Sequence, residues 1–77
     1  MRIISKEFHR DIPYDIAVLQ VTTFGFSKPE ERDEYTLTAV VNGMYYTIAR
    51  TETEQEMNGI LSDILYANRV GLSEIEV

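Results

Sequence analysis

The only histidine of this 77-residue chain, His9, has a carboxylate two residues away on each side. Glu7 and Asp11 would share a face with His9 in an extended segment, because side chains alternate along a strand. A histidine beside carboxylates is typical of general bases and of metal ligands. However, no Ser, Cys or Lys stands in a recognisable nucleophile motif. We therefore interpret His9 as a surface residue near a loop and expect that the chain is not an enzyme.

Two acidic groups have the oxygen atoms that a divalent cation prefers. The first lies within residues 30–34 and the second within residues 52–56. Neither group has the spacing of an EF-hand loop, with its central glycine and terminal glutamate. Lys28 and Arg32 also stand in or beside the first group. We interpret the groups as a solvated loop and a helix N-terminus, and we expect no metal ion and no cofactor.

A different kind of candidate site lies on a predicted helix. Gly59, Ser62 and Tyr66 share one side of it, with Asp63 beside them. Glycine inside a helix costs roughly 1 kcal/mol relative to alanine, so a glycine there favours close contact with another molecule. Tyrosine is common in binding hot spots. The alternative is an ordinary exposed tyrosine and a tolerated glycine. The predicted protein-binding residues are Glu52, Glu54, Glu56, Gly59, Asp63, Tyr66 and Tyr45.

The net charge of −6 is concentrated toward the C-terminus. Residues 51–77 contain six acidic residues and one basic residue, a net charge of −5, whereas residues 1–50 contain seven and six, a net charge of −1. An acidic surface repels phosphate and attracts basic surfaces. Three basic residues near the N-terminus, Arg2, Lys6 and Arg10, make only a weak patch. We therefore expect a protein partner with a basic surface rather than a nucleic acid, although the same charge would also keep a small domain soluble.

The clearest turn signal is Asn42-Gly43, which lies between two alternating runs. Asn-Gly suits a type I′ hairpin turn, because both central residues need positive φ. The register then predicts three facing pairs: Val41 with Met44, Ala39 with Tyr46, and Leu37 with Ile48. These six residues form the predicted core face. The opposite, Thr-rich face would carry Thr36, Thr38, Val40, Tyr45, Thr47 and Ala49.

A helix is predicted over residues 52–69. Either of two capping boxes can start it, Thr51 with Glu54 or Thr53 with Glu56. Gly71 is the expected left-handed residue after its end. The predicted apolar stripe, which should pack on the core face of the hairpin, is Met57, Ile60, Leu61, Ile64, Leu65 and Asn68.

Further strands are expected on both sides of the hairpin and helix. Residues 15–24 should pair antiparallel with residues 34–41, after a charged loop over residues 25–33. Residues 72–77 alternate and are expected to return to the sheet as an edge strand, and residues 2–8 are expected to form a short strand. Ile12-Pro13-Tyr14 is interpreted as a turn, because Pro13 lacks an N–H. The expected fold is α+β, with one helix on a small antiparallel or mixed sheet of three to five strands.

Length and composition predict a single domain over residues 1–77. The chain has no cysteine, so its fold does not depend on disulfides. The longest nearly uncharged stretch, residues 16–27, is too short and too polar to cross a membrane. We expect a cytoplasmic protein with no membrane partner.

The first functional hypothesis is a small acidic protein-interaction module that binds and inhibits or regulates its partner. In size, acidity and α+β composition the chain resembles phage-encoded inhibitors of bacterial defence or of host enzymes that act on nucleic acids. That resemblance is of type only, and no motif carries it. The alternative is a structural homo-oligomer that uses its Thr-rich sheet face or a sheet edge. Direct nucleic-acid binding is the weaker alternative.

Overall fold

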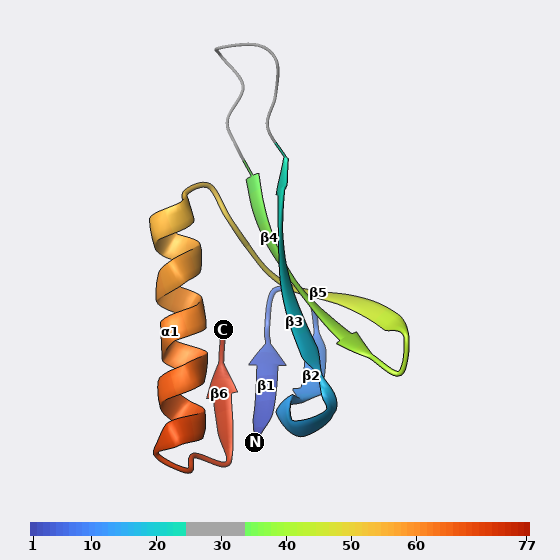
Figure 1. The fold of residues 1–77 in the computed structure, drawn as a ribbon, viewed down its shortest axis with the longest axis vertical. Coiled ribbons are helices and arrows are strands. Elements are labelled where there is room, and N and C mark those ends of the chain that lie inside the picture. The colour runs from blue at the N-terminus through green and yellow to red at the C-terminus, as the bar shows by residue number, and fades with distance from the viewer. Residues whose placement is uncertain (25–33) are drawn as a thin grey trace.

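The computed structural model describes residues 1–24 and 34–77. It confirms the predicted α+β class, with one α-helix and six strands in these residues (Figure 1). The predicted loop over residues 25–33 lies outside them. The elements are β1 (Arg2–Ser5), β2 (Arg10–Pro13), the 3₁₀ helix η1 (Tyr14–Ile16), β3 (Val18–Phe24), β4 (Glu34–Val41), β5 (Met44–Thr51), α1 (Glu54–Arg69) and β6 (Glu74–Glu76).

The strands form two three-stranded sheets rather than one, in the orders β2-β1-β6 and β3-β4-β5. We call them the small sheet and the large sheet. β6 is parallel to β1, and the two lie side by side next to α1 in Figure 1. The predicted return of the C-terminal segment to a sheet edge is confirmed. The predicted turn at Ile12-Pro13-Tyr14 is wrong, because Ile12 and Pro13 belong to β2, an edge strand, where proline is tolerated.

β4 and β5 form the predicted hairpin. Asn42 has a φ of 51° and Gly43 a φ of 78°, as a type I′ turn requires. Next to the turn the register is as predicted, with Val41 opposite Met44 and Ala39 opposite Tyr46. β3 pairs antiparallel with β4, also as predicted, although it begins at Val18 because η1 occupies the residues before it.

An irregularity in the pairing changes the register farther from the turn. Thr38 is opposite Thr47 and Leu37 is opposite Ala49, so Ile48 is an extra residue with no direct partner. The predicted pair of Leu37 with Ile48 is therefore wrong. Ala49, predicted on the Thr-rich face, lies in the core and is only 6% exposed. The bulge explains how Ile48 and Ala49 are buried in succession, which the alternation of a regular strand would not allow.

The small sheet supplies a hydrogen bond to this bulge. The buried hydroxyl of Ser5, at the end of β1, donates to the carbonyl oxygen of Ile48 at 2.6 Å. The Ser5 oxygen also accepts a bond from the Phe8 N–H, at 3.4 Å. A buried carbonyl without a partner would cost about 1–3 kcal/mol. Ser5 therefore joins the two sheets at the point where the ladder of the large sheet is interrupted.

Thr53, from the second of the two predicted capping boxes, is the N-cap of α1. The Glu56 carboxylate meets the Thr53 hydroxyl, whereas in a full capping box it accepts from the N-cap backbone N–H. The Thr53 hydroxyl accepts a hydrogen bond from the Glu56 N–H at 3.2 Å and donates to the Glu56 carboxylate at 3.0 Å. Thr51 is not the cap, since its hydroxyl donates to the Thr53 carbonyl at 2.9 Å. The helix consequently starts at Glu54, two residues after the predicted start.

The end of α1 is the predicted glycine C-cap. Gly71 has a φ of 78°, in the left-handed region. The N–H of Leu72 donates to the carbonyl of Ala67 at 3.0 Å, and the N–H of Gly71 donates to that of Asn68 at 3.2 Å. These two bonds are those of a Schellman motif. The turn redirects the chain into β6.

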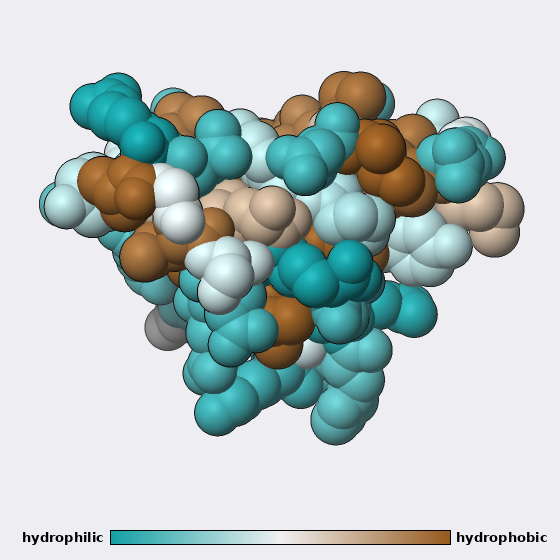
Figure 2. All heavy atoms as spheres, turned by 90° about the horizontal axis from the view of Figure 1, so that it is seen from below, coloured by the Kyte–Doolittle hydropathy of each residue, from teal (hydrophilic) through white to brown (hydrophobic). Residues whose placement is uncertain are grey.

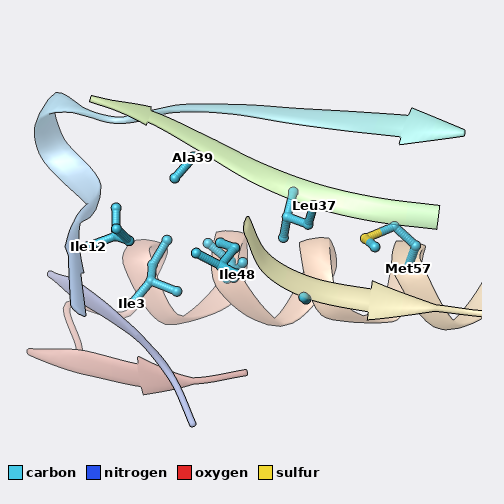
Figure 3. Close-up of a cluster of buried hydrophobic side chains, with 8 residues drawn as sticks. Ile3, Ile12, Leu37, Ala39, Ile48 and Met57 are labelled. Carbon is cyan, nitrogen blue, oxygen red and sulfur yellow. The ribbon is translucent and has the colours of Figure 1, made fainter. Parts of the chain in front are cut away.

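Side chains from both sheets and from α1 meet in one core (Figure 3). α1 packs on β4 and β5, as predicted, and also on β6. Its buried residues are Met57, Ile64 and Ala67. Leu65 and Asn68 were predicted in the buried stripe but are exposed, because α1 faces the core along a narrower band. The labelled core residues are Ile3 and Ile12 of the small sheet, Leu37, Ala39 and Ile48 of the large sheet, and Met57.

Candidate protein interface

Four of the predicted binding residues lie on one face of α1. Glu56, Gly59, Asp63 and Tyr66 follow one another at intervals of three or four, which places them on the same side of the helix. All four are exposed, and Tyr66 is 62% exposed. Val70, which the sequence analysis did not include, continues this face at the helix end and is also exposed. We call these five residues the α1 stripe.

The remaining predicted residues lie elsewhere. Glu52 precedes the helix. Glu54 is nine residues before Asp63, which corresponds to opposite sides of a helix at 3.6 residues per turn. Tyr45 is opposite Val40 in the hairpin, on the sheet face that points away from α1. The structure therefore does not bring Glu54 or Tyr45 together with the α1 stripe.

Gly59 leaves an open place in the middle of the α1 stripe. A Cβ atom added at Gly59 would meet no described heavy atom within 4 Å, the helix's own backbone apart. Its φ is not in the left-handed region. Neither close packing nor backbone conformation within the described chain therefore requires a glycine at this position.

The ion pairs that the structure describes do not involve the α1 stripe. They join the N-terminal amine to Asp15, Arg2 to Asp11, Lys6 to Glu76, and Arg50 to Glu34. The Glu56 carboxylate accepts a bond from the Thr53 hydroxyl. Within residues 1–24 and 34–77, Asp63 has no basic partner. The α1 stripe therefore presents negative charge to solvent.

His9 and its neighbouring carboxylates do not form the arrangement of an extended segment. β1 ends at Ser5, so the predicted strand over residues 2–8 is only partly confirmed. His9 is exposed in the following turn with a φ of 54°. The Asp11 carboxylate accepts a hydrogen bond from Arg2 Nε at 2.5 Å. In the described parts of the chain, no three His, Asp or Glu side chains group closely enough to hold a metal ion.

The sequence did not predict an open groove between α1 and the segment that leads into β3. Its volume is about 580 Å³. Leu65, on its helix side, is 56% exposed. Figure 2 views the molecule from the end that holds the C-terminus of α1, where several separate hydrophobic clusters lie among hydrophilic residues. In the sequence, the groove was indicated only by the width of the predicted apolar stripe on α1, which includes residues that the core does not bury. The lining residues are Tyr14, Asp15, Ala17, Leu19, Leu61, Leu65 and Asn68.

Known proteins give no further guide to these surfaces. Comparisons of the chain with protein-family models, with curated proteins and with solved structures find no match. No helix in the described residues is long and apolar enough to cross a membrane.

Proposed function

We propose that this chain is a non-catalytic interaction module, which binds a basic surface of a protein partner through the α1 stripe and thereby inhibits or regulates that partner. The observation that carries the proposal is the exposure of Tyr66 next to the Asp63 carboxylate, for which the described residues provide no cation. Tyrosine supplies much of the binding energy in many interfaces. An uncompensated carboxylate beside it attracts basic partners and selects against acidic ones.

Gly59 supports the same surface. Glycine at a helix interior is less favourable than alanine by about 0.8–1.0 kcal/mol, and the described chain has room for a methyl group there. The absence of a side chain between Asp63 and Glu56 would allow a partner's backbone or side chain to approach the helix closely. The stripe would then combine a flat central contact with an aromatic residue at one end and carboxylates along its length.

The partner class follows from charge. Enzymes that act on nucleic acids present basic surfaces to phosphate groups. The acidic α1 stripe is suited to such a surface, and occupying it would exclude the nucleic acid. This is the mode of action expected of a phage or mobile-element inhibitor of a host defence enzyme.

Affinity capture from the native host's lysate tests the proposal with three baits. The wild-type chain is compared with Asp63→Lys and with Glu7→Lys, which makes the same charge change in the turn between β1 and β2. A true partner should be enriched by the wild-type chain and by Glu7→Lys, and lost with Asp63→Lys. It should also be released at high salt, because exposed charge pairs are screened.

Tyr66→Ala separates the aromatic contribution from the charge. Binding of the captured partner should weaken by about 2 kcal/mol or more if Tyr66 is a hot spot. Equal capture by every bait, or binding unaffected by salt, would contradict the proposal. Circular dichroism of each variant would establish that the helix is intact.

A further inference from the structure

β3 differs from every other strand in the described residues because it contains no charged residue. Its sequence is VLQVTTF. The β-branched residues and the lack of proline favour extended pairing. The other strands each contain at least one charge, among them Arg2 in β1, Glu34 in β4 and Arg50 in β5.

One edge of β3 is unpaired in the large sheet. β3 pairs with β4 on one side only, since the strand order is β3-β4-β5. Its side chains are exposed along most of the strand, with Val18 at 62% and Val21 at 44%. An edge strand of this kind presents free backbone N–H and C=O groups to another strand.

The edges of the small sheet are protected against such pairing. β6 is three residues long and carries Glu74 and Glu76. β2 carries Arg10 and Asp11 and ends at Pro13. Short length, charge and proline are the features by which natural sheets discourage edge pairing. β3 has none of them.

The inner face beside the β3 edge is also incompletely covered. Within the large sheet, α1 packs on β4 and β5 more than on β3. Leu19 of β3 lines the groove of about 580 Å³, with Leu61 and Leu65 on its other side. A strand added at the β3 edge would direct its inner side chains toward this groove, because alternate residues of paired strands share a face. The edge and the groove are therefore separate observations that favour the same occupant, an extended strand with apolar inner residues.

We propose that this strand is β3 of a second copy of the chain, paired antiparallel about a two-fold axis to give a continuous six-stranded sheet. Two copies that each carry a net charge of −6 repel each other, so they should meet where neither contributes a charge. β3 satisfies this condition. The contact is isologous, so the free groups of the paired residues in one copy meet their counterparts in the other.

The register that places apolar residues opposite one another pairs Gln20 with Gln20 of the second copy. Leu19 is then opposite Val21 of the second copy on the inner face, and Val18 is opposite Thr22 on the outer face. Cross-strand pairs of apolar and β-branched residues stabilise sheets. The α1 helices of the two copies lie on the same side of the extended sheet, because inner-face residues of one β3 are opposite inner-face residues of the other. This surface is separate from the α1 stripe, so the dimer does not depend on the proposed function.

Sedimentation over a wide concentration range tests the dimer. The wild-type chain should pass from monomer to dimer as concentration rises. Val21→Lys, an inward charge on the edge strand, should raise the dimer dissociation constant by about tenfold or more. Ser62→Lys makes the same charge change on the exposed side of α1 and should leave the dimer unchanged. A wild-type chain that stays monomeric, or a dimer that survives Val21→Lys, overturns the proposal.

Disulfide cross-linking gives a second measurement that does not depend on a folded lysine variant. Because the chain has no cysteine, a single introduced thiol can link only to its copy. Gln20→Cys should form a covalent dimer under mild oxidation, since directly opposite Cβ atoms in a sheet are about 4.5–5.5 Å apart. Ser62→Cys should remain monomeric under the same conditions. Equal cross-linking of the two variants would indicate random collision and would count against the β3 contact.

Discussion

The small sheet and the large sheet of this molecule differ in how their edges are protected against pairing with further strands. The strands of the small sheet are four, four and three residues long, and ion pairs lie at Arg2–Asp11 and Lys6–Glu76. The strands of the large sheet are seven, eight and eight residues long, and β3 has no charge. Short strands with charged edges resist further pairing, whereas a long uncharged edge invites it.

The two sheets therefore differ in where they can form contacts with another molecule. Charged residues protect the edges of the small sheet against pairing, and two of them are the glutamates of β6. In the large sheet, no strand of the described residues pairs with the outer edge of β3, and α1 leaves part of the inner face uncovered. Yet neither sheet has a core of its own, because Ile3, Leu37 and Ile64 belong to one cluster. Substitutions in each sheet can test whether the two sheets are one folding unit and how much each feature contributes to stability.

The largest effect is expected from the shared core. Ile3→Ala in the small sheet and Leu37→Ala in the large sheet should each lower the free energy of unfolding by about 2–5 kcal/mol. Both side chains are fully buried. Denaturant unfolding, followed by circular dichroism, should show one transition in each variant. A small effect of Ile3→Ala, or two separate transitions, would mean that the small sheet is an appendage.

The second-largest effect on stability should come from the hydrogen bond that joins the two sheets. Ser5→Ala should cost about 1–3 kcal/mol, because it leaves the buried carbonyl of Ile48 without its donor. Ser73→Ala, at an exposed position before β6, is the matched control and should change stability little. If the two variants unfold at the same denaturant concentration, the hydrogen bond between the sheets contributes nothing.

A stabilising change in α1 should act on both sheets together. Gly59→Ala should raise the free energy of unfolding by about 0.8–1.0 kcal/mol, since a methyl group fits there and alanine is the better helix former. Gly43→Ala should have the opposite sign, because its φ of 78° disfavours a side chain although space is open around it. Thermal melts of the two variants measure both signs. A destabilised Gly59→Ala chain would show that something within the chain needs this glycine.

The smallest effects should come from the ion pairs. Double-mutant cycles at Lys6–Glu76 and at Arg50–Glu34 should each give about 0.2–1 kcal/mol, the range of exposed pairs. The second pair should be the stronger, because the Glu34 side chain is only 35% exposed while those of Lys6 and Glu76 are 75% and 57% exposed. Added salt should reduce both. A larger coupling at Lys6–Glu76 would reverse this order.

The predictions that succeeded depend on local signals. Asn42-Gly43 specified a type I′ turn and the register beside it, because few residues accept positive φ. Gly71 marked the end of α1, and the two possible capping boxes placed its start within two residues, because backbone groups at helix ends need nearby partners. Each of these features is decided within a few residues, so one sequence was sufficient.

The predictions that failed depend on packing between distant segments. The bulge at Ile48 carries no local mark such as glycine, and it is supported by Ser5 from the other end of the chain. Likewise, Leu65 has the spacing of a buried residue, but the band of α1 that meets β4 and β5 does not reach it. The turn assigned at Pro13 was wrong because an edge position in the small sheet tolerates proline.

The α+β class, the hairpin, the C-terminal end of α1 and the negative charge of the C-terminal part could all be read from the sequence. It also contained the residues of the α1 stripe, because a helical repeat alone places Glu56, Gly59, Asp63 and Tyr66 on one side. The tertiary structure was needed to show that the strands divide into two sheets, that Tyr45 lies away from this stripe and that, among the described residues, β3 is paired on one edge only. Pairing partners are chosen by burial across the whole chain, and a local pattern shows only which segments are able to pair.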